Sequence, residues 1–279
     1  MPTADPKPSF SISRVKPLRP AGVERQLQEL EFGLFRPLKG EGLYKKVPSS
    51  GGAILYGPPG TGKTSIVKYC AAQAKVQTIF LKASDVHSKF IGEGEKALAK
   101  VFQEAYKVAP AVIIMDEIEC IFPSRSASTS TEHQKSLLSQ LLVEMDQASA
   151  NRVALVGTTN HLHAIDPALL RRLPVHIEVN LPNQASRHVL IEQLLKEHKH
   201  LLKPAQVRSL AYKTELCSGS DLTAMFSNAI SRLARKVSTT QLRPGQRRAR
   251  TLPPLKLRDF HLPAHCPHKI YNHRVGRKG

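Results

Sequence analysis

The chain has 279 residues, of which 41% are hydrophobic, so it can bury one sizeable core and a small satellite core. Its formal net charge is +19, and its four scattered cysteines form no CxxC pair, so the cysteine pattern suggests neither a disulfide framework nor a zinc ribbon. No run approaches the ~20 apolar residues of a membrane span, and the N-terminus MPTADPKPSF lacks a signal-peptide core. We therefore expect a soluble intracellular protein, cytoplasmic or else nuclear or cytoskeletal.

Short apolar and β-branched runs recur in the first two thirds of the chain, with helical patterns between them that begin at Thr64, Glu93 and Glu132. The runs predict strands at 53–57, 78–83, 111–118, 152–160 and 175–181. This alternation predicts a mostly parallel sheet with helices on both faces. The run AVIIM at 111–115 is apolar throughout, which indicates a central strand that is covered on both sides.

After Pro182 the strand pattern stops and three helical segments follow, the last with Ser220 as its expected N-cap. These changes in pattern predict four parts of the chain. They are a flexible N-terminal segment at 1–20, an α/β domain at 21–182, a helical domain at 183–237 and a basic, flexible tail at 238–279.

The end of the chain is strongly basic. Gln241–Gly279 holds ten Lys or Arg residues and one acidic residue, Asp259, for a net charge of +9. Such a run is either a solvated extension or a binding segment for a nucleic acid, the acidic tails of tubulin or an anionic membrane surface. A metal site is a further alternative, although the spacing matches no regular zinc pattern; its candidate ligands are His261, His265, Cys266, His268 and His273.

The segment GPPGTGKT, Gly57–Thr64, fits the phosphate-loop pattern and lies between a predicted strand and a predicted helix. Its glycines allow successive N–H groups to point inward at a helix N-terminus, where phosphate is favoured. Lys63 can reach the β- and γ-phosphates, and the Thr64 hydroxyl can ligate Mg²⁺. The expected nucleotide-binding residues are Gly57, Pro58, Pro59, Gly60, Thr61, Gly62, Lys63, Thr64, Ser65 and Asp116.

Polar side chains also follow two later strands. Asp116 and Glu117 come at the end of AVIIMDE, where doubly wound sheets present ligands. Asp116 can hold Mg²⁺ through water, and Glu117 can orient or deprotonate the attacking water. Asn160 ends the next strand and can hydrogen-bond both the γ-phosphate and that water. We therefore expect an ATP site with Mg²⁺.

The segments GPPGTGKT, SKFIGEGEK, IIMDE, GTTN, IDPALLRRL and SGSDLTAMF occur in this order. As an ordered set they resemble the motifs of the classical AAA ATPases, and NLPNQASR most resembles the meiotic clade of katanin, spastin and fidgetin. The resemblance covers about Gly22–Val237. It implies a P-loop NTPase αβα sandwich with a five-stranded, mainly parallel sheet, and a small all-helical lid domain. It also implies ATP and Mg²⁺ as cofactors and a ring, usually a hexamer, of identical or different subunits.

The resemblance assigns roles to two further groups of residues. Arg171 and Arg172 would reach the γ-phosphate held by the adjacent subunit, where a forked guanidinium suits the charge of phosphoryl transfer. Lys89, Phe90 and Ile91 would form a central-pore loop that grips an extended polypeptide, for which the aromatic face of Phe90 is suited.

Three functions remain open from the sequence. The first is a Mg-dependent ATPase that remodels or threads a protein client, with microtubule severing and tubulin as the specific case. The second is a nucleic-acid-associated ring ATPase, which the basic tail favours. The third is a nucleotide-gated scaffold subunit, since the Pro- and His-rich tail shows no recognisable ring-bracing helix.

Overall fold

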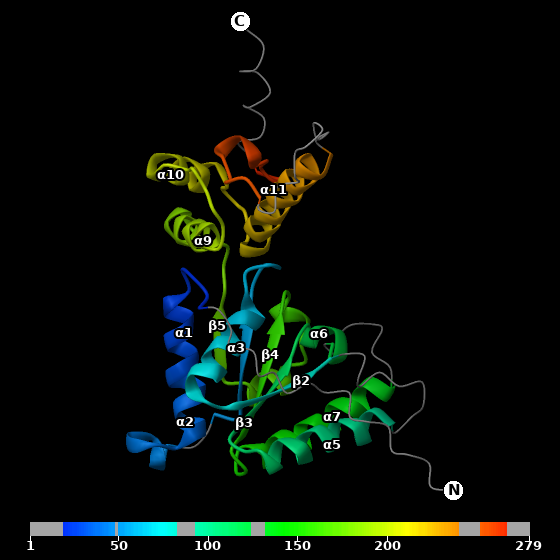
Figure 1. Ribbon diagram of the computed structural model, residues 1–279. Helices are drawn as coiled ribbons and strands as arrows, with labels where there is room; N and C mark the ends of the chain where they lie inside the picture. Colours follow the sequence, from blue (N-terminus) through cyan, green and yellow to red (C-terminus); the bar gives the residue numbers. More distant parts are fainter. Residues whose placement is uncertain (1–18, 48–49, 83–92, 124–131, 240–251, 267–279) are drawn as a thin grey trace, which may run out of the picture. The chain divides into compact units, whose positions relative to one another are not determined.

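A computed structural model of the chain describes residues 19–47, 50–82, 93–123, 132–239 and 252–266 (Figure 1). The chain divides into two compact units. The α/β unit runs to Val179 but leaves out Pro59–Gly62, and the helical unit contains Pro59–Gly62 and the chain from Asn180 onward. The expected division between 182 and 183 lies close to this boundary. No helix in the described ranges is long and apolar enough to cross a membrane.

The α/β unit is built on one five-stranded sheet with the order β2-β3-β4-β1-β5. All four neighbouring pairs are parallel, which confirms the predicted α/β class. The parallel pairing places every strand's carboxyl end at one edge of the sheet, where ligand sites form in such folds. The strands are β1 (Gly52–Tyr56), β2 (Gln77–Leu81), β3 (Ala111–Met115), β4 (Val153–Thr159) and β5 (Val175–Glu178).

Helices cover both faces of this sheet, as the alternating pattern predicted. The strand β3 is buried along its whole length, with Ile113 and Met115 in one core cluster and Val112 and Ile114 in the other. The first cluster is covered by α5 (Glu93–Lys107), α6 (Ile118–Ile121), α7 (Glu132–Ala148) and α8 (Pro167–Arg172). The second is covered by α1 (Glu24–Leu30), a π-helical turn (Glu31–Phe35), α2 (Arg36–Lys39) and α3 (Lys63–Ala74). Short 3₁₀ turns at Gly42–Lys46 and Leu162–Ala164 complete the unit.

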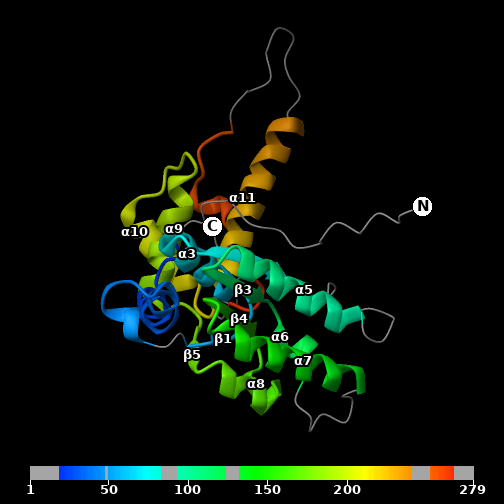
Figure 2. The same cartoon turned by 90° about the horizontal axis from the view of Figure 1, so that it is seen from below.

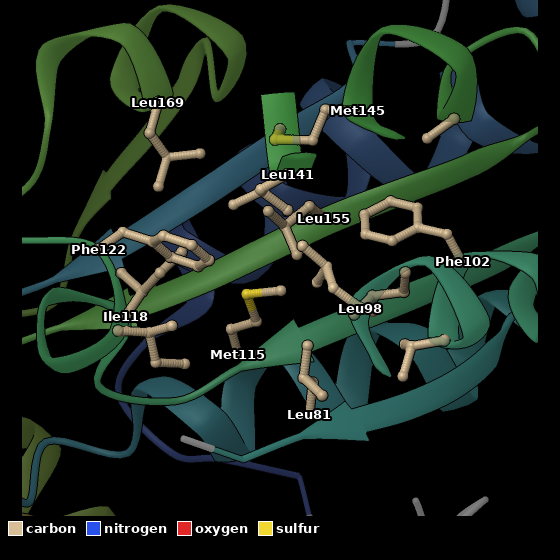
Figure 3. Packing of buried hydrophobic residues seen from close by; sticks show 14 of the residues in the cluster. Leu81, Leu98, Phe102, Met115, Ile118, Phe122, Leu141, Met145, Leu155 and Leu169 are labelled. Carbon is tan, nitrogen blue, oxygen red and sulfur yellow. The ribbon is translucent and has the colours of Figure 1, made fainter. Parts of the chain in front are cut away.

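The helices α5 and α7 run side by side (Figures 1 and 2). Figure 3 shows how Phe102 from α5 and Leu141 from α7 gather around Leu155 of β4 and Met115 of β3. All four side chains are fully buried. Burying a side chain of this size stabilises the fold by about 1.5–3 kcal/mol relative to exposure, so this core fixes the strand ends that carry the site.

The helical unit contains α9 (Gln184–Lys196), α10 (Pro204–Lys213) and α11 (Gly219–Thr239). Its third helix begins at Gly219, so the expected N-cap at Ser220 is wrong. Ser218 takes that place, because its Oγ accepts from the N–H of Asp221 at 3.2 Å while the Asp221 carboxylate accepts from the Ser218 N–H at 2.8 Å. This reciprocal pair is the arrangement of a capping box, with Asp221 in the position that usually holds Glu or Gln.

Part of the expected flexible tail is instead folded onto the helical unit. Within 252–266, Leu255, Phe260 and Cys266 are buried in the same core cluster as Phe226. The rings of Phe226 and Phe260 lie 4.7 Å apart in an edge-to-face arrangement, and a 3₁₀ turn spans Leu257–Asp259. These apolar residues are spaced irregularly among prolines, so periodicity does not reveal that they are buried. The expectation of flexibility is corrected for these residues.

Candidate active site

The phosphate loop joins β1 to α3, as its flanking sequence predicted. Gly57, Gly60 and Gly62 have φ angles of 139°, 74° and 92°, which side-chain-bearing residues rarely adopt. A Cβ atom on Gly57 would also collide with the carbonyl oxygen of Val179. The turn therefore needs glycine at these positions.

The tip of the loop belongs to the helical unit. Within that unit the N–H of Ser220 donates to the carbonyl oxygen of Gly60 at 3.1 Å. A Cβ atom on Gly60 would lie 2.7 Å from the Ser218 hydroxyl oxygen, so this approach also depends on glycine.

Lys63, the first residue of α3, is buried with only 8% of its surface exposed. Its ammonium donates to the carbonyl oxygens of Gly57 and Pro58 at 2.8 and 2.9 Å and to Oδ1 of Asn160 at 2.8 Å. Burial lowers the pKa of Lys63. The negative charges of the nearby carboxylates oppose that shift, and Asp116 has the largest opposing effect. The structure thus brings together two predicted site residues that are far apart in the sequence.

The two predicted magnesium ligands are also in contact. The Thr64 hydroxyl donates to Oδ1 of Asp116 at 3.0 Å, and the Thr158 hydroxyl donates to the same oxygen. Hydroxyl and carboxylate oxygens are the hard ligands that Mg²⁺ accepts alongside water and phosphate. The residues present therefore fit a magnesium ion. Thr158 was missed in the sequence, although it lies two residues before Asn160 in the GTTN segment.

Glu117 follows Asp116 and is exposed, with the left-handed angles φ 51° and ψ 51°. A non-glycine residue in this region is strained by about 1–3 kcal/mol, and such strain concentrates at functional sites. Glu119, two residues further along the chain, accepts from the N–H of Asn160 through Oε1 at 3.1 Å. This carboxylate was also missed; it holds the backbone at the end of β4 and so positions Asn160.

The two arginines of α8 have different surroundings. Asp166 caps this helix, accepting from the N–H of Ala168 at 2.8 Å. Arg172 forms a bidentate pair with Asp146 of α7, with distances of 2.8 and 3.0 Å to its two oxygens. Arg171 is exposed. Arg172 is therefore held by a carboxylate of the same chain, whereas Arg171 is accessible.

The predicted pore residues Lys89, Phe90 and Ile91 lie outside the described residues, as do His268 and His273. His265 and Cys266 from the predicted metal cluster are described, and they lie next to Cys217 rather than in a cluster of tail histidines.

Comparisons with known proteins point to one family. Residues 53–181 match the family described as "ATPase family associated with various cellular activities (AAA)". The chain is 36% identical over 197 residues to spastin of Ixodes scapularis, covering 69% of this chain and 30% of that protein. It is 31% identical over 224 residues to the ATPase family gene 2 protein of Schizosaccharomyces pombe, covering 79% of this chain and 28% of that protein. It is 33% identical over 226 residues to Fidgetin-like protein 1 of Drosophila melanogaster, covering 80% and 43%. The chain thus spans less than half the length of these relatives.

Proposed function

The chain belongs to the AAA ATPase family, as its motif order predicted, and on this premise we propose that it is a Mg-dependent ATPase that remodels a protein client. The observation that carries the proposal is the polar cluster at the carboxyl edge of the sheet. There Lys63 contacts Asn160, and Thr64 contacts Asp116. A phosphate-binding cation and a magnesium-binding pair at neighbouring positions match the needs of phosphoryl transfer.

In the proposed reaction each residue of the cluster has a distinct task. Lys63 would donate to the β- and γ-phosphate oxygens of ATP, and Thr64 and Asp116 would hold Mg²⁺, which would neutralise charge on those phosphates. Glu117 accepts a proton from the attacking water as it is oriented toward the γ-phosphorus. Asn160 donates from its amide nitrogen to the γ-phosphate, because its oxygen faces Lys63.

The last part of the site comes from a neighbouring subunit in this proposal. Arg171 is exposed at the end of α8, and a guanidinium placed on the γ-phosphate of an adjacent subunit would stabilise the spread charge of the transition state. Arg172 would contact the same phosphate only after its ion pair with Asp146 breaks. Hydrolysis then requires assembly, for which we propose a hexameric ring of identical or different subunits.

We further propose that the ring acts on a polypeptide threaded through its pore, with Lys89, Phe90 and Ile91 as gripping residues. On the resemblance to katanin, spastin and fidgetin we propose tubulin as the specific client, with severing of microtubules as the outcome and the cytoskeleton as the location. The relatives named spastin and fidgetin-like support this choice.

The proposal is tested by mixing two inactive variants. Glu117→Gln keeps Arg171 but cannot accept the proton, and Arg171→Ala keeps Glu117 but lacks the finger. In mixed rings some sites combine an intact Glu117 with an intact Arg171 from the neighbour. We expect each variant alone to lose turnover by about 10²-fold or more and the mixture to recover part of it.

The parent protein should also show specific ATPase activity that rises with protein concentration, because each site borrows a residue. A matched control is Lys68→Ala, which removes an exposed cation from α3 without touching the cluster. Concentration-independent turnover, or a mixture as inactive as its parts, would contradict the proposal.

A further inference from the structure

A cluster of sulfur and nitrogen ligands lies in the helical unit and contains none of the residues assigned to the ATP reaction. One ligand atom from each of Cys217, His265 and Cys266 lies within 4.8 Å of the other two. Cys217 and Cys266 are about fifty positions apart in the sequence, so the fold of 252–266 onto the helical unit creates the cluster.

The cluster is held in place by backbone contacts on both sides. The N–H of Cys217 donates to the Thr214 carbonyl at 3.1 Å, and the N–H of Cys266 donates to the Pro263 carbonyl at 3.2 Å. Cys217 is completely buried and Cys266 is 2% exposed. The His265 side chain is half exposed, so the cluster is closed on the sulfur side and open to water on the imidazole side.

We propose that Cys217, Cys266 and His265 bind one zinc ion, with a water molecule in the fourth position. Zinc takes cysteine sulfur and histidine nitrogen together in tetrahedral sites, and thiolates disfavour the hard cations Mg²⁺ and Ca²⁺. Bond lengths of about 2.0–2.3 Å place ligand atoms about 3.5–3.8 Å apart in such a tetrahedron. The observed limit of 4.8 Å is close to this spacing, so small side-chain movements would complete the site.

Asp221 supplies the support that zinc-binding histidines usually have. Its Oδ2 lies 3.4 Å from Nε2 of His265 and accepts hydrogen bonds from the N–H and hydroxyl of Ser218. A carboxylate on one ring nitrogen fixes the imidazole and leaves the other nitrogen for the metal. Nδ1 of His265 is thus assigned as the ligand atom. The metal would also tie 252–266 to the start of α11.

The test is zinc binding by the full chain, stripped of metal and kept reduced. Zinc is titrated against a chromophoric chelator, and Co²⁺ is used separately as a probe, because thiolate coordination gives it a near-ultraviolet charge-transfer band. We expect one equivalent of zinc and that band. Cys217→Ser, Cys266→Ser and His265→Ala should each weaken zinc binding by about 10-fold or more.

Two control variants should bind zinc like the parent protein. Cys120→Ser replaces an exposed cysteine of α6, and His261→Ala replaces an exposed histidine of the segment 252–266. His265→Ala keeps the test valid if a cysteine variant fails to fold, because His265 is half exposed. Unchanged zinc affinity in that variant would overturn the proposal. So would a reduced chain that binds no zinc, including one whose only reaction is oxidation to a Cys217–Cys266 disulfide.

Discussion

The ammonium of Lys63 donates a hydrogen bond of 2.8 Å to the carboxamide oxygen of Asn160, which joins the start of α3 to the end of β4. This contact fixes the orientation of the Asn160 amide, because the oxygen faces the cation and the nitrogen is left to donate elsewhere. The two residues are 97 positions apart, so the parallel order of β1 and β4 brings them together.

Replacing Lys63 with Ala should weaken ATP binding by about 10-fold or more, since the loop loses its charge-assisted donor to phosphate. Titration with a fluorescent ATP analogue measures the change. Lys68→Ala on the exposed side of the same helix should leave the affinity unchanged. Equal affinities for all three proteins would show that phosphate binds elsewhere.

Asn160→Ala should act differently, because it would remove the proposed contact to the γ-phosphate without removing charge. We expect turnover to fall by about 10²-fold, as for other single donors to a reacting oxyanion, while ATP binding changes far less. Comparing kcat with the dissociation constant of the analogue separates the two effects. Loss of binding as large as the loss of kcat would contradict this role.

The pair of Asp146 and Arg172 predicts a gain of activity. Asp146→Asn removes the carboxylate that holds Arg172 in its own subunit, so turnover by the assembled protein should rise. Arg172→Ala should lower it by about 10³-fold or more if this guanidinium reaches the neighbouring phosphate. Stability should change by less than about 1 kcal/mol, because the pair is largely exposed. Equal loss of activity in both variants would contradict this prediction, because it would show that turnover requires the intact ion pair.

Tyr106 predicts a loss of stability in alkali. Its hydroxyl lies 3.5 Å from a Glu144 carboxylate oxygen, and burial, with this negative charge, raises the pKa of Tyr106 to about 12. The folded state therefore holds this proton more tightly than the unfolded state, whose tyrosine titrates near pH 10. The contribution of protonated Tyr106 to the stability of the folded state is complete below pH 10 and is lost as the pH rises toward 12. The free energy of unfolding, measured with denaturant between pH 10 and 12, should fall less steeply with pH for Tyr106→Phe than for the parent protein. The same pH dependence in both proteins would refute the assignment.

The folded part of the tail is tested by a core substitution. Phe260→Ala should lower the free energy of unfolding of the helical unit by about 3–5 kcal/mol, since the ring packs against Phe226. Leu252→Ala, at a 43% exposed position of the same segment, should cost less than about 0.5 kcal/mol. Urea melts followed by circular dichroism provide both values. Indifference to both substitutions would mean that the segment contributes nothing to this core.

Much of the α/β unit follows from local pattern. The all-apolar run at Ala111–Met115 predicted a doubly covered strand, and the glycines around Lys63 predicted the phosphate loop. Asp116 and Asn160 were identified because parallel strands end at one edge of a sheet. These inferences need only periodicity and the geometry of parallel strands.

The remaining contacts depend on positions that no local pattern connects. Asp146 and Arg172 meet because α7 and α8 pack on the same face of the sheet. Cys217 and Cys266 meet because scattered apolar residues fold 252–266 onto three helices, although the segment resembles a solvated basic tail. The composition of a segment indicates its charge and its tendency to be flexible. It does not show which of its apolar side chains are buried against other parts of the fold.

The three acceptors around Lys63 have one more consequence. An ammonium has three N–H groups, and all three are already directed at oxygens of the chain itself. An incoming anion must displace at least one of these oxygens before it gains a full contact with the cation. Weakly basic ions such as chloride or sulfate offer little in exchange, so the loop should discriminate against the abundant small anions of the cell and respond to a polyphosphate that engages the whole loop at once.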